Sequence, residues 1–167
     1  MKWLSIDMGR YIGWALWDDN LLLQSGSKNF EKITPFKQRL GHIINYFCMM
    51  FKDENPKLIV VESLEGDVKF WGSMNQQNRI WGAICCLAHL NCSEFFEINQ
   101  KTVKKQATGS GNAEKKEVQD TIKKLYGEEH GKNEHRADAV AIGMAFLKLT
   151  CDLTMLDVLR NMKEEEE

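Results

Sequence analysis

Two acidic side chains stand where predicted β-strands end. Asp7 closes the apolar run that contains Trp3, Leu4 and Ile6, and Glu62 closes the run LIVV. A carboxylate at the end of a buried strand destabilises a fold unless it is solvated, paired or bound to a cation. The carboxyl ends of central strands in α/β sheets are also where ligands usually lie. Asp7 and Glu62 are therefore candidate metal ligands, and the alternative for each is an ordinary strand-end acid.

A second pair of candidate ligands, His135 and Asp138, lies near the C-terminus. The two residues are three positions apart on a predicted helix, so they share one face of it. If this helix packs beside the first strand, both side chains meet Asp7 and Glu62. An oxygen-rich cluster with one imidazole suits Mg²⁺ or Mn²⁺, and two such cations about 3.5–4 Å apart favour phosphodiester hydrolysis. The alternative is that His135 and Asp138 only stabilise the start of the helix.

A basic stretch between positions 101 and 124 is a candidate phosphate-binding surface. Its net charge of +4 comes from three acidic residues and seven lysines, which are Lys101, Lys104, Lys105, Lys115, Lys116, Lys123 and Lys124. Such a surface attracts the phosphates of nucleic acids, although a solvated helix face can have the same composition.

Two glycines, Gly109 and Gly111, interrupt the basic stretch. They predict a tight turn before a helix that Asn112 caps. The free N–H groups at the start of this helix, together with Lys115 and Lys116, could hold a phosphate near the metal ions.

Hydrophobic periodicity predicts the elements that must position these residues. Predicted strands cover Lys2–Asp7, Tyr11–Trp17, Leu21–Phe30, Leu58–Val61 and Phe95–Ile98, and predicted helices cover Phe36–Phe51, about Met74–Leu90, a segment near Lys101, Ala113–Leu125 and His135–Leu149. Thr34 is expected as the cap of the helix at Phe36, with Pro35 as its first position. Three antiparallel strands followed by alternating helices and strands predict an α/β fold with a five-stranded mixed sheet flanked by helices.

Length and composition favour one globular domain over residues 1–167, with residues 155–167 as a helical, acidic tail. Hydrophobic residues make up 43 % of the chain and charged residues 28 %, the balance of an ordinary globular protein. No apolar run reaches the roughly 18 residues that a membrane span needs. We therefore expect a cytoplasmic protein of a bacterial cell or of a phage-infected host.

The remaining chemically reactive and aromatic side chains have a structural interpretation. The five cysteines include no Cys-x-x-Cys pair, and free thiols fit them better than disulfides. Cys86, His89 and Cys92 could in principle bind zinc, but core and surface positions of one helix explain their spacing better. Trp14, Trp17 and Phe47 are expected in the core.

Five segments of the chain carry a resemblance to a known family. They are SIDMGRYIGWAL, VVES, NRIWGAI, VKKQATGSGNAEKKEVQ and HRADAVAIG, and together they reach from the first strand to Gly143. In this order they resemble the RuvC family of Holliday-junction resolvases, which has the ribonuclease H-like fold. The segment GSGNAEK is the most diagnostic of them.

The resemblance implies a divalent-metal-dependent endonuclease that cuts four-way junctions and other branched DNA. It implies four metal ligands, Asp7, Glu62, His135 and Asp138, which would hold two Mg²⁺ or Mn²⁺ ions in each active site. It also implies DNA contacts from Lys104 and Lys115, and we expect Lys105, Lys116, Gly109 and Gly111 to extend that surface.

The chain departs from the family pattern at several positions. Met8 stands where bacterial members usually have proline, and His135 stands where many members have a fourth carboxylate. Glu65 occupies the place of an aromatic residue that follows the second acid in well-known members. We expect Phe70 or Trp71, slightly later in the chain, to supply the surface that stacks on a base.

The resemblance further implies a homodimer that places two active sites on symmetry-related strands of the junction. The helix near Ile80–Leu90 and the C-terminal residues Leu153, Leu156, Leu159 and Met162 are candidate partner surfaces. A related nuclease for structured RNA or other branched DNA, or a non-catalytic nucleic-acid-binding module, are the alternative functions. Actin-like ATPases share the Asp-x-Gly motif, but they need two such domains, which this length cannot hold.

Overall fold

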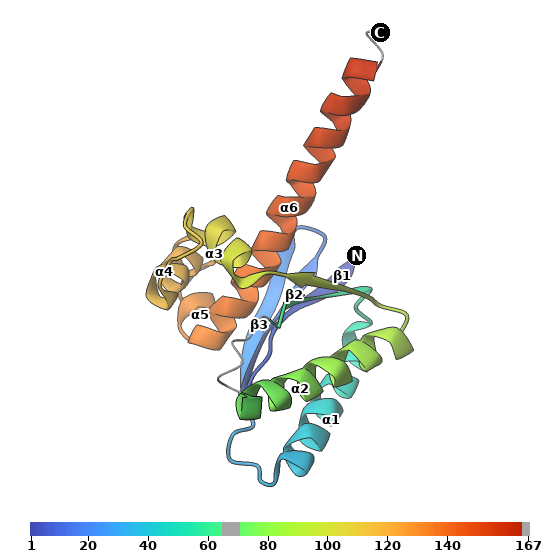
Figure 1. Ribbon diagram of the computed structural model, residues 1–167, viewed down its shortest axis with the longest axis vertical. Coiled ribbons are helices and arrows are strands. Elements are labelled where there is room, and N and C mark those ends of the chain that lie inside the picture. Colours follow the sequence, from blue (N-terminus) through green and yellow to red (C-terminus); the bar gives the residue numbers. More distant parts are fainter. Residues whose placement is uncertain (65–70, 165–167) are drawn as a thin grey trace.

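The structure is a computed structural model that describes residues 1–64 and 71–164 (Figure 1). Its strands are β1 (Lys2–Asp7), β2 (Tyr11–Asp18), β3 (Leu21–Asn29), β4 (Leu58–Glu62) and β5 (Glu94–Ile98). Its helices are α1 (Phe36–Glu54), α2 (Trp71–Leu90), α3 (Gln100–Thr108), α4 (Lys115–Tyr126), α5 (Glu128–Gly131) and α6 (Glu134–Glu164). The predicted order of strands and helices is confirmed, and the short helix α5 is an addition to it.

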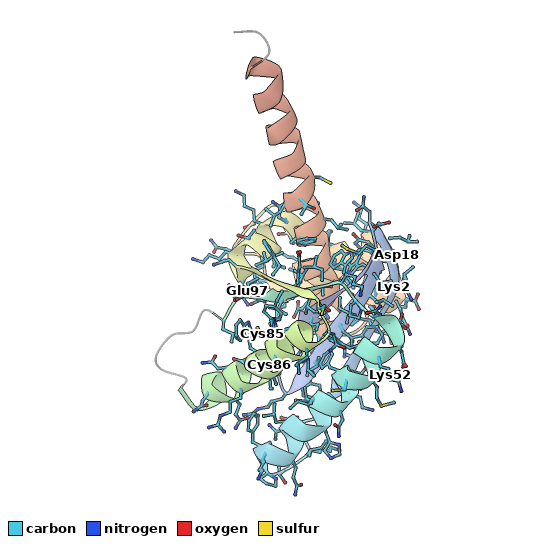
Figure 2. The ribbon with its side chains drawn as sticks, turned by 90° about the vertical axis from the view of Figure 1, so that its right-hand side faces the viewer. Lys2, Asp18, Lys52, Cys85, Cys86 and Glu97 are labelled. Atoms are coloured by element: carbon cyan, nitrogen blue, oxygen red, sulfur yellow. The ribbon has the colours of Figure 1, made fainter. Side chains whose placement is uncertain are left out.

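The strands form one mixed sheet in the order β3-β2-β1-β4-β5, as the sequence predicts. The first three strands pair antiparallel, and β4 and β5 run parallel to β1. In the β1–β2 hairpin, Lys2 pairs with Asp18 at one end and Asp7 pairs with Gly13 at the other. Lys2 and Asp18 therefore mark the end of the sheet that lies away from the candidate ligands (Figure 2).

Helices cover both faces of the sheet and enclose two hydrophobic cores. One core lies between the sheet and helices α1 and α2, and the other lies between the sheet and helices α3, α4 and α6. The central strand β1 supplies both, with Leu4 and Ile6 on the α1 side and Trp3 on the α6 side. This placement explains why Trp3, Leu4 and Ile6 of β1 are all apolar, since both faces of the strand are buried.

The predicted core aromatics are mostly confirmed. Trp17 and Phe47 are fully buried, in the α6-side and α1-side cores respectively. Trp14 is half-buried against the α1-side core, and its indole N–H donates a hydrogen bond of 2.8 Å to the hydroxyl of Tyr46. A polar partner at the rim of the core accounts for the partial exposure of Trp14.

The boundaries of helices α1, α2 and α4 differ from the prediction. Pro35 is the N-cap of α1 rather than its first residue, because its ψ of 172° is extended rather than helical. Helix α2 begins at Trp71, three residues before the predicted start. Helix α4 is capped by Glu114 and not by Asn112, because Glu114 and Glu117 form a reciprocal capping box.

Helix α6 is twice as long as predicted, since it continues past Leu149 to Glu164. Its first half packs against the sheet, and its second half extends away from the rest of the molecule (Figure 1). The expected helical tail from residue 155 is therefore present up to Glu164. Among the described residues, no helix combines the length and the apolar character needed to span a membrane.

Two close contacts fix the first half of α6 on the sheet. The Ser5 hydroxyl donates a hydrogen bond of 2.7 Å to the carbonyl oxygen of Ala139 and accepts one of 2.9 Å from the Trp17 indole N–H. Gly143 lies directly over the Trp17 ring, where any larger side chain would overlap that ring. These contacts hold this half of α6 against β1 and β2.

Candidate active site

Asp7 and Glu62 lie near each other because the strands that carry them, β1 and β4, are neighbours in the sheet. The parallel pairing of β1 with β4 sets Leu4 opposite Ile59 and Ile6 opposite Val61, so each acid ends its strand at the same edge. This arrangement follows from the position of both residues directly after a buried apolar run.

The start of α6 brings His135 and Asp138 to the same edge. Nδ1 of His135 lies 2.9 Å from Oδ2 of Asp7, within hydrogen-bonding distance. Asp7, His135 and Asp138 each offer a ligand atom, and these atoms all lie within 4.8 Å of one another. Glu62 is not part of this tight group, but it lines the same cleft. The convergence predicted from the sequence is therefore seen for three of the four residues, with Glu62 beside them.

The electrostatics of the cluster show an excess of negative charge. Burial, followed by repulsion from Asp7 and Asp138, raises the pKa of Glu62 from 4.5 to about 7. Burial and repulsion from Asp7 likewise raise the pKa of Asp138 from 3.8 to about 7. The pKa of His135 is also raised, chiefly by its hydrogen bond to Asp7. A bound cation would favour the ionised form of these carboxyl groups and reduce the repulsion between them, so this donor set fits a divalent metal ion.

The cluster forms one wall of a cleft of about 610 Å³. Lys104 of α3 and Lys115 of α4 also line this cleft, and their charges partly lower the raised pKa of Glu62. Lys115 forms an ion pair with Glu134 at the start of α6. The cleft therefore combines an acidic centre with ammonium groups, which is the arrangement needed to hold a phosphate beside metal ions.

The other residues expected to contact DNA lie outside the cleft lining. Lys105 and Lys116 are exposed on α3 and α4. Gly109 is the left-handed C-cap of α3, with φ of 88°, a conformation that favours glycine. Gly111 passes close to the carbonyl oxygen of Lys101. Local backbone structure therefore explains why glycine occupies both positions. The contact of these glycines with DNA stays a prediction.

A capping box occupies two of the backbone N–H groups at the start of α4, those of Glu114 and Glu117. The Glu114 backbone N–H donates a hydrogen bond of 2.9 Å to Oε2 of Glu117, and the Glu114 carboxylate caps the helix in return. Two carboxylates at this terminus oppose the binding of an anion there, so phosphate binding at the start of α4 stays a prediction that rests on its lysine side chains.

The predicted stacking residues are not tested by the structure. Phe70 lies outside the described residues, and Trp71 begins α2 without a described side chain. Their contact with a base stays a prediction.

Sequence reasoning missed two residues around the cluster. Tyr11, at the start of β2, lines the cleft and stacks its ring on the imidazole of His135, with centroids 5.1 Å apart. Lys101 of α3, one of the seven lysines of the predicted basic stretch, also lines the cleft. Gly13 contacts the backbone of His135, and nothing in its local sequence reveals that approach.

Comparison with known proteins gives consistent matches. The family model described as crossover junction endodeoxyribonuclease RuvC matches residues 20–146, an interval that begins after Asp7. The RuvC protein of Carboxydothermus hydrogenoformans is 34 % identical over 130 residues, which cover 73 % of this chain and 80 % of that protein.

Solved structures share the fold at low sequence identity. The Thermus thermophilus RuvC structure matches with a TM-score of 0.73 and 22 % identity, over 87 % of this chain and 92 % of that one. Thermus thermophilus RuvC in complex with a Holliday junction substrate matches with a TM-score of 0.73 and 20 % identity, over 87 % and 91 % of the two chains. The yeast mitochondrial Holliday junction resolvase Ydc2 matches with a TM-score of 0.72 and 15 % identity, over 98 % and 83 %.

Proposed function

Because the chain belongs to the RuvC family of crossover junction endodeoxyribonucleases, we propose that it resolves four-way DNA junctions by metal-dependent hydrolysis of phosphodiester bonds. The observation that carries this proposal is the group of Asp7, His135 and Asp138, whose ligand atoms converge in a cleft lined by Lys104 and Lys115. Bringing carboxylates together costs free energy because they repel one another, and DNA binding without catalysis does not require such a cluster.

Asp7, Glu62, His135 and Asp138 are the proposed ligands of two Mg²⁺ or Mn²⁺ ions. Bound there, the ions supply an activated water nucleophile and neutralise charge on the leaving oxygen. Support for this assignment comes from the raised pKa values of Glu62 and Asp138, which reflect first the burial of these carboxyl groups and then the negative charge of their acidic neighbours. The Asp7 carboxylate also orients the ring of His135 through the contact at its Nδ1.

Lys104 and Lys115 are the proposed phosphate-binding residues of the same cleft. Each places a positive charge close enough to Glu62 to lower its pKa, so a phosphate beside the acidic cluster would lie within reach of both. Lys101 lines the same wall and would extend the positive surface. These charges steer DNA to the cleft and offset the repulsion between its phosphates and the carboxylates.

We include a homodimer in the proposal, because a four-way junction has two strands to cut and one chain carries one such cluster among its described residues. The surfaces suggested by the sequence, Ile80–Leu90 and the second half of α6, are the ones to examine. Light scattering of the purified protein, with and without junction DNA, tests the dimer directly.

The decisive experiment compares end-labelled substrates of different shape. A four-way junction, a fork, a nicked duplex and an RNA hairpin are each incubated with the protein and Mg²⁺ or Mn²⁺. Paired cuts in opposing strands of the four-way junction support the proposal. Preferential cutting of the fork or the RNA hairpin would instead favour a related nuclease of different substrate shape. Junction binding without any cutting in either metal would overturn the enzymatic assignment.

A further inference from the structure

His135 is held by three residues of the β1–β2 hairpin, two at its imidazole and one at its main chain. Asp7 contacts its Nδ1 at 2.9 Å. Tyr11 stacks on its ring with an interplanar angle of 9°. Gly13 lies against its main chain. Asp7 is a proposed metal ligand, whereas Tyr11 and Gly13 have no role in the function proposed above.

Gly13 allows the start of α6 to lie directly on β2. A Cβ atom at this position would overlap the carbonyl group of His135 and come within 3.2 Å of the backbone nitrogen of Arg136. Real Cβ atoms essentially never approach another atom closer than 3.0 Å. The backbone of Gly13 is in a β-strand and has no left-handed φ. Glycine is therefore needed at position 13 because the backbone of His135 comes so close, and not because of the backbone conformation of Gly13 itself.

The same glycine also faces the first metal ligand. In the β1–β2 pairing Gly13 is the partner of Asp7. The spacing between the Asp7 carboxylate and the His135 ring thus depends on how closely α6 approaches β2 at this one residue. A side chain here would have to displace the first turn of α6 away from Asp7, because β2 is fixed by its neighbours β1 and β3.

Tyr11 restricts the ring of His135 rather than its backbone. Its own ring is fixed in turn, because the Tyr11 hydroxyl donates a hydrogen bond of 3.0 Å to Oε2 of Glu31. The guanidinium of Arg10 lies 3.7 Å from the other carboxylate oxygen of Glu31. The half-buried Tyr11 ring therefore packs on one face of the imidazole and opposes its rotation about the side-chain bonds.

We infer that Gly13 and Tyr11 are positioning residues for His135, with Gly13 setting the place of its main chain and Tyr11 the orientation of its ring. This inference rests on the proposed role of His135 as a metal ligand. It predicts that both residues control metal affinity without being metal ligands themselves. Residues that orient metal ligands typically change metal affinity or activity about 10–100-fold when they are replaced.

The test of Gly13 is the substitution Gly13→Ala, with Gly143→Ala as its matched control. Both glycines are buried and lie where α6 packs on β2, but Gly143 meets the Trp17 side chain while Gly13 meets the backbone of His135. Mn²⁺ is titrated by calorimetry into each protein without DNA, and unfolding by urea is measured in parallel. Gly13→Ala should weaken Mn²⁺ binding about 10–100-fold, whereas Gly143→Ala should lower stability and leave Mn²⁺ affinity as in wild type. Equal Mn²⁺ affinity in Gly13→Ala and wild type would overturn the assignment of Gly13.

The test of Tyr11 compares Tyr11→Leu with Tyr11→Phe. Leucine removes the flat ring from the imidazole, and phenylalanine keeps the ring but loses the hydrogen bond to Glu31. Tyr11→Leu should lower Mn²⁺ affinity several-fold without a matching loss of stability, and Tyr11→Phe should bind Mn²⁺ more tightly than Tyr11→Leu. Equal affinities in these two variants and wild type would refute the role of Tyr11. This pair also decides the inference if Gly13→Ala does not fold.

These outcomes are separable from failure of the proposed function. A wild-type protein that binds Mn²⁺ but cuts no junction would contradict the junction-resolving activity, and the affinity differences among the variants would still stand. A crystal structure of Gly13→Ala gives a further readout that needs neither metal nor DNA. It should show the distance between His135 Nδ1 and Asp7 Oδ2 lengthened beyond the 2.9 Å of the wild type.

Discussion

Replacing Glu62 with glutamine should stabilise the metal-free protein at alkaline pH. The pKa of Glu62 is raised from 4.5 to about 7, by burial first and then by the charges of Asp7 and Asp138. A carboxyl whose pKa is raised by folding binds its proton more tightly in the folded state than in the unfolded state. Its ionised form therefore destabilises the fold, and the loss of stability develops as pH rises from about 4.5 through about 7.

The size of the effect follows from the change in pKa. One pKa unit corresponds to about 1.36 kcal/mol, so ionised Glu62 costs the fold at most about 3 kcal/mol above pH 7. Glutamine keeps the shape of the side chain and removes the charge. We expect Glu62→Gln to raise the free energy of unfolding by roughly 1–3 kcal/mol at pH 8. The gain should disappear at pH 4, where the wild-type carboxyl is protonated in both states.

Urea unfolding followed by tryptophan fluorescence, in EDTA at pH 4 and pH 8, measures this difference. Glu97→Gln is the matched control, because Glu97 is an exposed glutamate on the adjacent strand β5 (Figure 2). It should change stability by less than about 0.5 kcal/mol. Added Mn²⁺ should stabilise the wild type, because a ligand that binds only the folded state raises its stability, and should stabilise Glu62→Gln less.

One result would refute this reasoning. If Glu62→Gln is no more stable than the wild type at pH 8, or if its gain in stability is equally large at pH 4, then burial and the charges of Asp7 and Asp138 do not destabilise the ionised carboxylate of Glu62. The electrostatic case for a metal site would then lose its main support, although the geometry of Asp7, His135 and Asp138 would be unaffected.

The remaining predictions concern the other side chains of the cleft. Asp7→Asn should bind four-way junctions at least as tightly as wild type in a gel-shift assay and should cut them at least about 100-fold more slowly. Cutting at a rate within a few-fold of wild type would show that Asp7 is not a catalytic residue. Lys104→Ala and Lys115→Ala should each weaken junction binding and reduce the slope of log K against log salt by about one. Unchanged slopes would show that these lysines are solvated and do not contact phosphates. Metal binding should weaken as pH falls through about 7, because protons then compete at Glu62 and Asp138 and at the raised pKa of His135. His135→Asp should shift the metal preference from Mn²⁺ towards Mg²⁺, and an unchanged preference would show that His135 is not a ligand.

The sequence by itself determined the elements and the chemical identity of the site. Strands and helices could be placed because hydrophobic periodicity is a local property, and the central sheet strands are apolar on both faces. Asp7 and Glu62 could be assigned to one edge because each follows a buried run, and the spacing of His135 and Asp138 puts them on one helix face. All of these inferences need only the residues within one or two elements.

Helix ends were less predictable, since several side chains compete to cap each one. Asn112 has the better intrinsic preference as a cap, yet Glu114 takes that role because Glu117 completes a capping box with it. Pro35 lies outside α1 rather than in its first turn. The sequence analysis placed one helix over His135–Leu149 and a helical tail from residue 155, whereas α6 runs through both as a single helix.

Only the tertiary structure decided how the cluster is assembled. Nothing near Gly13 in the sequence indicates that its missing side chain admits the backbone of His135, which lies more than a hundred residues later. The stacking of Tyr11 on His135 and the ion pair of Lys115 with Glu134 likewise join distant segments. The raised pKa values of Glu62 and Asp138 depend on burial and on charges from other elements. Local sequence sets which groups are available, whereas the distances between them arise from the packing of α6 against the sheet.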